Sequence, residues 1–164
     1  MTESVRKNVP VVLIIVFIVA VGIYVVRAIS QRPSVEKQIT KQLGQEKLIG
    51  RIGSGYFNFE VADSPSERNQ GLSGRQPLKS TEAMIFAFEE PGQSCFWMKD
   101  MKFNLDILWF DETKKLIYEK RDVSPTTYPE SFCSDTPAKY VVEVTAGVAA
   151  KNQIKIGDVL DVEL

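Results

Sequence analysis

The sequence predicts a mostly β domain, a compact antiparallel β-sandwich or barrel with two short helices, preceded by one N-terminal transmembrane helix. Two observations predict the domain: short apolar or alternating segments recur after residue 56, and turn-forming residues separate them. A third observation, an uninterrupted apolar run near the N-terminus, predicts the membrane helix. Because many strands are joined in sequence by short turns, we expect antiparallel pairing.

The N-terminal run has the length and composition of a membrane anchor. From Asn8 to Val26 the chain carries no charged residue, and as a helix this run would span roughly 28 Å, close to the hydrocarbon core of a bilayer. We expect residues 1–8 to be a short basic tail and residues 9–26 to lie in the lipid bilayer. The run is longer than the apolar region of a cleaved signal peptide and lacks a good small-x-small cleavage site, which favours a retained anchor.

The orientation of this anchor has arguments on both sides. More Lys and Arg residues lie after it, between residues 27 and 41, than before it, which by the positive-inside rule would leave the C-terminal domain in the cytoplasm. A very short basic tail before an apolar run instead resembles a signal-anchor that exports the downstream domain, and the cysteine pair agrees with export. We expect a single-pass plasma membrane protein whose C-terminal domain is extracytoplasmic.

The remaining chain divides into a stalk and a folded domain. Residues 27–55 are expected to form a partly helical stalk, because a narrow apolar stripe ends at glycines that loosen the chain. The β domain is expected over residues 56–164. Its first strand is predicted by the alternation of residues 57–62. Ser64 and Glu67 then have the spacing of a capping box, which predicts a helix of about two turns.

The later elements are predicted by short apolar runs. Strands are predicted over residues 84–88, 94–99, 105–110, 116–120 and 138–144, with a last one around Val159 and Val162. The segment 94–99 is expected to pair with 84–88 through a turn at residues 91–92. Thr145 is expected to cap a short helix that ends at Lys151.

The two cysteines are candidates for a disulfide. Cys95 lies on a predicted strand and Cys133 in a long polar loop over residues 122–137. In an oxidising compartment they would pair, and closing this loop would stabilise the fold by roughly 3–4 kcal/mol. The alternative is two unpaired thiols, one of them buried as a small apolar side chain.

The composition excludes several classes of function. The chain contains no histidine, so it has no Ser-His-Asp triad, no Cys-His pair and no imidazole-ligated metal site. We expect no cofactor and no metal site. The net charge is −1, and a weakly acidic domain has no net attraction to phosphates, so nucleic acid is not expected as a partner.

The run Phe96-Trp97-Met98-Lys99, with Leu105-Asp106-Ile107 after it, resembles the domain of unknown function 192 (DUF192) family. Further matches in the family's order are Val61-Ala62-Asp63, Glu67-Arg68, Gly71-Leu72, Arg75, Met84-Ile85-Phe86 with Phe88, Pro137-Ala138, Tyr140-Val141, Glu143, Ala146-Gly147 and Ile156-Gly157-Asp158. The resemblance covers residues 57–164. It implies a compact, mostly β domain, often exported or membrane-tethered in prokaryotes, with no established activity. Ser73 and Asp100 stand where the family commonly has Met and Asn.

A candidate binding cluster consists of Arg68, Arg75, Trp97, Lys99, Asp106 and Glu143. Trp97 and Lys99 share one face of a predicted strand, and with Asp106 they would form a pocket floor. The favoured alternative places Trp97 in the core, with Lys99 paired to Asp106 or Asp100. For Arg68 and Arg75, an intramolecular ion pair, for example with Glu143, is favoured over recognition of a ligand carboxylate.

We expect a membrane-anchored domain with a non-catalytic binding or structural role in the cell envelope, where an envelope ligand or protein is its partner. The lack of histidine and of a clear nucleophile favours a role without catalysis. The alternative is a carboxylate-dependent hydrolase of an envelope glycan or similar polymer. In that hydrolase, two of Asp63, Asp106 and Glu143 would act as acid and base.

Overall fold

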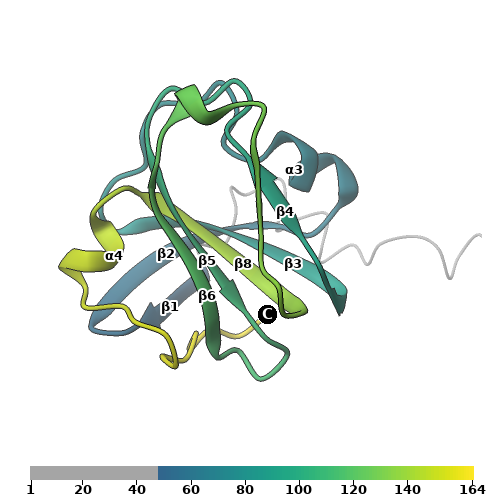
Figure 1. Cartoon of the computed structure of the whole chain (residues 1–164). Coiled ribbons are helices and arrows are strands. Elements are labelled where there is room, and N and C mark those ends of the chain that lie inside the picture. The colour runs from purple at the N-terminus through teal and green to yellow at the C-terminus, as the bar shows by residue number, and fades with distance from the viewer. Residues whose placement is uncertain (1–47) are drawn as a thin grey trace, which may run out of the picture. The chain divides into compact units, whose positions relative to one another are not determined.

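Six strands form one sheet in the order β1-β2-β3-β8-β5-β6 in the computed structural model, which describes residues 48–164 (Figure 1). The six are β1 (Leu48–Ile52), β2 (Gly55–Ala62), β3 (Glu82–Gly92), β5 (Leu105–Phe110), β6 (Leu116–Val123) and β8 (Ala138–Thr145). A separate two-stranded ribbon contains β4 (Cys95–Trp97) and β7 (Ser131–Cys133). The short helices are α3 (Pro65–Gln70) and α4 (Val148–Lys151), with a 3-10 turn η1 (Pro125–Thr127). The prediction of a mostly β domain with two short helices is confirmed.

The predicted transmembrane helix over residues 9–26 lies outside the described residues. Within residues 48–164, no helix has the length and apolar character needed to cross a bilayer.

The expected antiparallel sandwich or barrel is wrong in two respects. Strands β2 and β3 pair in parallel, with Phe59 opposite Ala83, because the crossover of residues 63–81, which contains α3, returns the chain to the same end of the sheet. The sheet also remains open, with β1 and β6 at its edges.

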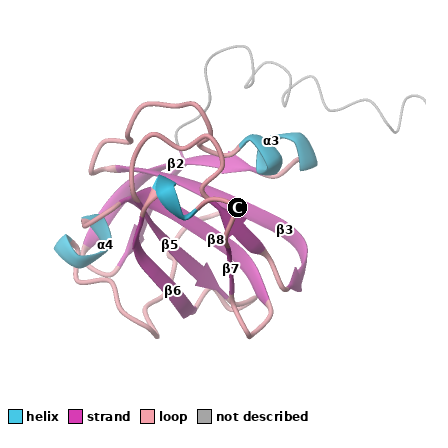
Figure 2. Cartoon of the chain, turned by 45° about the horizontal axis from the view of Figure 1, so that its top comes forward, coloured by secondary structure: helices cyan, strands magenta, loops and turns pink. Residues whose placement is uncertain are grey.

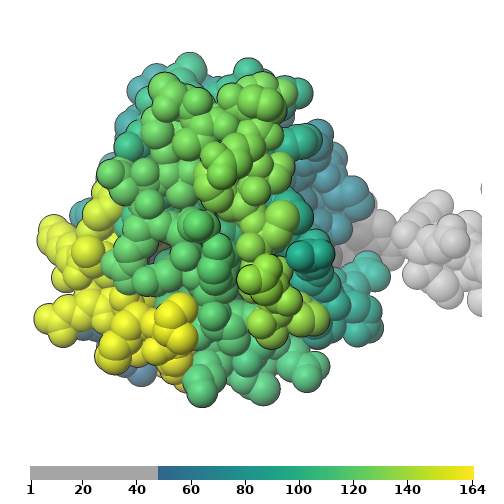
Figure 3. All heavy atoms as spheres, in the orientation of Figure 1, coloured from purple at the N-terminus to yellow at the C-terminus, as the bar shows by residue number. Residues whose placement is uncertain are grey.

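The C-terminal segment does not form the last strand expected there. It makes only isolated bridges, between Val159 and Lys115 and between Asp161 and Arg51. In the space-filling view this segment, yellow, lies against the green atoms of earlier parts of the same chain (Figure 3). Its Leu160 and Val162 join the apolar cluster on one face of the sheet, so the segment covers the sheet without extending it.

The folded domain begins earlier than the expected boundary at residue 56. Residues 48–52, assigned to the stalk from sequence, form β1, which pairs with β2 through a tight turn at Gly53 (φ 57°). Gly50 is needed for close packing rather than for flexibility. A Cβ atom there would lie 2.6 Å from the backbone oxygen of Asp161, so this glycine lets the C-terminal segment approach β1.

Each face of the sheet carries its own apolar cluster, as period-2 alternation requires. On one face, Leu108 and Val142 belong to a cluster that also includes residues of α4 and the C-terminal segment. On the other face, Ile107 and Val141 belong to a cluster that includes residues of the loops around α3 and β4. In Figure 2, α3 and α4 lie at opposite sides of the sheet. Strand β5 is buried along its whole length, because both of its faces are covered.

The helix ends show one confirmed prediction and one wrong one. The capping box of α3 is present: the Ser64 hydroxyl accepts from the Glu67 backbone N–H at 3.3 Å, and the Ser64 N–H donates to the Glu67 carboxylate at 3.1 Å. Thr145 does not cap α4. Its hydroxyl donates instead to the Leu78 carbonyl at 2.9 Å, and Gly147 occupies the N-cap position.

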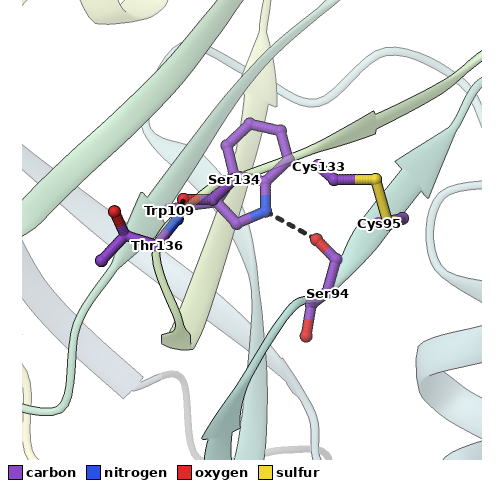
Figure 4. The surroundings of a disulfide bond; sticks show 6 residues. All are labelled: Ser94, Cys95, Trp109, Cys133, Ser134 and Thr136. Carbon is purple, nitrogen blue, oxygen red and sulfur yellow. Dashed lines mark hydrogen bonds between the residues drawn. A yellow bond between two sulfur atoms is a disulfide. The ribbon is translucent and has the colours of Figure 1, made fainter.

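The ribbon replaces the expected pairing of residues 94–99 with residues 84–88. Both edges of β3 are already occupied by β2 and β8, so β4 pairs with β7 from the long loop. Cys95 lies opposite Cys133, with their Cα atoms 4.2 Å apart, and the two form a disulfide (Figure 4). Beside it, the Trp109 indole N–H donates to the Ser94 carbonyl at 2.9 Å, which ties the ribbon to the main sheet.

Removing the disulfide is expected to lower the free energy of unfolding by about 3–4 kcal/mol, because the bond closes a loop with a sequence separation of 38 residues. Chemical denaturation of a Cys95→Ser/Cys133→Ser variant measures this loss. Wild-type protein in reductant should match the variant. Equal stability of the oxidised and reduced wild type would contradict the expectation.

Candidate functional site

A pocket of about 400 Å³ lies between α3 with the turn after it, strand β4, and the sheet face formed by β3 and β8. Its apolar lining includes Leu72, Phe86, Phe88, Phe96, Trp97 and Met101. Its polar side chains are Arg68, Asn69, Gln70, Ser73, Ser94 and Glu143. The lining thus combines apolar walls with polar groups, and small-molecule sites use such polar groups to orient their ligands.

Glu143 occupies the most unusual position in this pocket. It lies on β8, a central strand, directly opposite Met84 on β3 and Ile107 on β5, and only 4% of the residue is exposed. Its carboxyl group makes no hydrogen bond or ion pair with any residue in the described part of the chain.

The carboxyl group of Glu143 is reached from the pocket. Every fully enclosed polar side-chain atom in the described residues has a hydrogen-bond partner, so the unpaired oxygens of Glu143 are not fully enclosed. The carboxyl oxygens therefore remain slightly accessible from the pocket that Glu143 lines. Since buried carboxyl groups are normally paired, Glu143 is an acid held without a protein partner at the base of a cavity.

The surroundings of Glu143 change its proton affinity. Burial among apolar side chains disfavours the charged form and raises the pKa of Glu143 to about 8. At pH 7 about nine-tenths of the carboxyl groups therefore carry a proton. A desolvated acid in a pocket is a recognised mark of a functional site.

Arg68 lies in the same lining but is held away from Glu143. Its Nη1 donates to the Ala87 carbonyl at 2.9 Å and also to the Asp63 carbonyl, and its guanidinium carbon lies 5.1 Å from the centre of the Phe88 ring. No ion pair joins Arg68 to Glu143 within residues 48–164, so the favoured ion-pair interpretation does not describe it. No described residue accepts a hydrogen bond from Arg68 Nε or Nη2.

Arg75 forms the intramolecular ion pair that the sequence favoured, but with a different acid. Its two terminal nitrogens donate to the two carboxylate oxygens of Glu60 at 2.6 and 2.7 Å. Hydrogen bonding to Glu60 raises the pKa of Arg75. Arg75 does not line the pocket, so it acts between β2 and the turn after α3 rather than at the site.

Trp97 and Lys99 do not occupy the favoured positions. Trp97 is 49% exposed and meets Tyr128 edge to face, with ring centres 6.4 Å apart. The neighbouring Phe96 points inward and packs edge to face on Phe86 and Trp109, so alternation turns Trp97 outward to the rim of the pocket.

Lys99 is exposed and forms no ion pair with a described residue. The expected pairing of Lys99 with Asp106 or Asp100 is therefore wrong. Strand β4 ends at Trp97, so Lys99 lies beyond the ribbon rather than on a strand beside Asp106.

Asp106 has a structural role on the opposite face of the sheet. It is 1% exposed, its Oδ1 accepts from the Asp122 N–H at 3.0 Å, and its Oδ2 accepts from the Ala149 N–H at 3.1 Å. These bonds fix the end of β6 and the start of α4. Asp106 is adjacent in sequence to Ile107, the neighbour of Glu143, so the two acids face opposite sides. Asp63 is exposed and outside the lining, so no second carboxylate of the expected acid-base pair lies beside Glu143.

Sequence reasoning missed the aromatic walls, because Phe86, Phe88 and Phe96 meet only through tertiary packing. The sequence does contain one signal for the floor of the pocket. Glu143 interrupts the apolar run of residues 141–144, whose other three members are buried valines, and a carboxylate in such a run needs a reason. The residues that the structure describes contain no group of three acids or cysteines placed to hold a metal ion.

The raised pKa predicts how stability depends on pH. The unfolded chain releases the Glu143 proton near pH 4.5, whereas the folded protein keeps it until about pH 8. The folded state therefore binds more protons in this window, and raising the pH destabilises it. Relative to Glu143→Gln, the wild type should lose up to about 1.4 kcal/mol of unfolding free energy per pH unit between pH 5 and 8, with no further loss above.

Denaturation curves at several pH values measure this difference. The exposed Glu112, which lies in the turn between β5 and β6, provides the control variant Glu112→Gln. The control should follow the wild type. Parallel stability profiles for wild type and Glu143→Gln would show that Glu143 ionises normally in the fold.

Comparison with known proteins agrees with this architecture. A crystal structure of a protein of unknown function from Novosphingobium aromaticivorans DSM 12444 has a TM-score of 0.64 and 28% identity, covering 71% of this chain and 83% of its own. A second, from Sinorhizobium meliloti 1021 and described as a "putative transcription regulator", has a TM-score of 0.67 and 25% identity, covering 73% of this chain and 98% of its own. No curated protein matches the chain. Residues 48–162 match the profile of DUF192, described as an uncharacterized ACR, and the chain therefore belongs to the DUF192 family.

Proposed function

We propose that this protein is a non-catalytic module that binds a small ligand in the cell envelope, anchored to the plasma membrane by residues 9–26. The observation that carries the proposal is Glu143, a buried carboxyl group without a partner in the described residues, on the floor of a pocket large enough for a small molecule. A ligand that supplies a hydrogen-bond donor would satisfy this group, which the protein itself leaves unsatisfied.

The rim of the pocket supports binding as well. Trp97 is an exposed aromatic side chain in the pocket lining, and exposed apolar groups gathered at a cavity mark interaction sites. The disulfide holds β4, which carries Trp97, so the rim is fixed before a ligand arrives. A preformed site loses less conformational entropy on binding.

The disulfide also supports the extracytoplasmic placement of the domain, since such bonds persist in oxidising compartments. The apolar run of residues 9–26 supports attachment to the bilayer. Hydrolysis by two carboxylates is the weaker proposal. Asp106 faces away from the pocket, and among the described residues Glu143 is the one acid in the pocket lining.

Glu143→Leu is expected to separate a binding role from a structural one. If Glu143 serves a ligand, the free energy of unfolding of the leucine variant should be about 1–3 kcal/mol higher at pH 7, because an unpaired polar group is removed from an apolar site. Small molecules that raise the Tm of the wild type should not raise that of the variant. Lower stability of Glu143→Leu would assign the residue to the fold and overturn the proposal.

The placement outside the cytoplasm is expected to expose the domain's lysines to reagents that cannot cross a membrane. Spheroplasts treated with a membrane-impermeant amine reagent should label the domain as strongly as lysed cells do, because exposed lysines such as Lys79 and Lys99 would face the medium. A cytoplasmic protein measured in the same sample serves as the control. Labelling only after lysis would place the domain in the cytoplasm.

A further inference from the structure

The groups around Glu143 determine which chemical class of ligand the pocket can bind. The two strand neighbours of this residue, Met84 and Ile107, are apolar and buried. The wall of the pocket near the sheet contains Phe86 and Phe96, whose ring centres are 4.8 Å apart in an edge-to-face arrangement. The surroundings therefore offer a carboxyl group and aromatic rings, but no N–H donor that pairs with that carboxyl group in the described residues.

Aromatic rings and a carboxylate share one electrostatic preference. A ring carries negative charge on its face and attracts cations, and an ionised carboxylate accepts charge-assisted hydrogen bonds from an ammonium group. The thioether of Met101, also in the lining, is soft and polarisable and adapts to irregular ligands. Once Glu143 is ionised, above its pKa of about 8, an anionic ligand would meet an unfavourable carboxylate at the floor of this pocket.

We infer that the pocket takes a small organic cation, a primary ammonium group on an apolar or aromatic skeleton, whose ammonium binds the carboxylate of Glu143 while its skeleton packs on Phe86 and Phe96. This inference rests on the proposed binding function and names the class of ligand. The hydrogen-bonding capacity that Glu143 leaves unused is matched by the three donors of an ammonium group.

The charged groups around Glu143 allow this assignment. Strands β3 and β5 present apolar neighbours, and α3 contributes Arg68, whose Nη1 is held by the carbonyl groups of Asp63 and Ala87. Strand β4 contributes Cys95, which is in the disulfide and does not titrate. The exposed charged residues after β4, at positions 99, 100 and 102, do not line the pocket. Among the described residues, no cation of the protein forms an ion pair with Glu143.

Binding of a cation is linked to loss of the Glu143 proton. Below its pKa of about 8 the carboxyl group is mostly neutral, so the ammonium must displace a proton when it binds. The association constant should then fall about tenfold for each pH unit below 8 and level off above it, until the ammonium group begins to lose its own proton near about pH 10. At pH 7, binding should release about 0.9 proton per site. A neutral ligand would show no such dependence, and an anion would bind better at low pH.

Three probes with one skeleton test the inference: 2-phenylethylammonium, 2-phenylethanol and phenylacetate. Each is titrated into the folded protein between pH 6 and 9, with the indole signal of Trp97 and the methyl signal of Met101 measured by nuclear magnetic resonance. We expect the ammonium to bind at least tenfold more tightly than the alcohol at pH 8, with the stated pH dependence. Calorimetry in two buffers of different ionisation enthalpy should record the released proton.

Matched variants assign the effect to one carboxyl group. Glu143→Gln, which keeps the shape of the side chain, should lower ammonium affinity at least tenfold at pH 8 and abolish its pH dependence. Glu112→Gln should leave both unchanged. Binding of the alcohol or of phenylacetate without preference for the ammonium would overturn the inference while the binding function stands. Binding of none of the three probes would overturn both.

Discussion

Strand β8 is the constraint on which the rest of the structure depends. It lies between β3 and β5, and its residues 141–144 are buried on both faces. Three of these residues are valines that join the two apolar clusters, whereas the fourth is Glu143. Because β3 and β5 occupy both edges of the strand, Glu143 cannot move to water without disrupting the sheet. The backbone therefore holds a carboxyl group where side-chain chemistry alone would not place it.

The elements that cover the Glu143 face of the sheet leave a cavity between them. The parallel pairing of β2 and β3 requires a crossover, and this crossover brings α3 and Gly71 over the sheet. Gly71 has a φ of 46°, and a Cβ atom there would lie 3.3 Å from Cζ of Phe86, so the turn packs closely on one wall. The ribbon of β4 and β7 forms the other wall, held by the disulfide. The space between these two covers is the pocket.

Local signals are sufficient to predict much of this fold. The capping box of α3 and the apolar run of β5 depend on neighbouring residues in the sequence, and both are present in the structure. The predictions that are wrong depend on distant partners. Nothing near residues 94–99 shows that both edges of β3 are occupied, so pairing with the preceding strand is the natural expectation. Nothing in residues 48–52 shows that Gly50 is needed by the C-terminal segment.

The sequence predicts some residues of the candidate site but not the partners of those residues. Glu143, Arg68 and Trp97 do line the pocket, but their expected partners are wrong because ion pairs and facing directions arise from register and packing. Asp106 shows the contrast most clearly. Both Asp106 and Glu143 are buried acids on neighbouring strands. Asp106 receives two backbone N–H groups and contributes to the fold, whereas Glu143 receives none from the described residues.

This difference in hydrogen bonding separates an acid that stabilises the fold, Asp106, from one that does not, Glu143. A buried acid with two backbone donors has its hydrogen-bonding needs met, so its presence is explained by stability. A buried acid without donors lowers the stability of the folded state, and a leucine of similar size would fit the same apolar face with a smaller penalty. The fold alone therefore gives no physical reason for Glu143. A partner that arrives from outside the domain, through the pocket that Glu143 lines, supplies one.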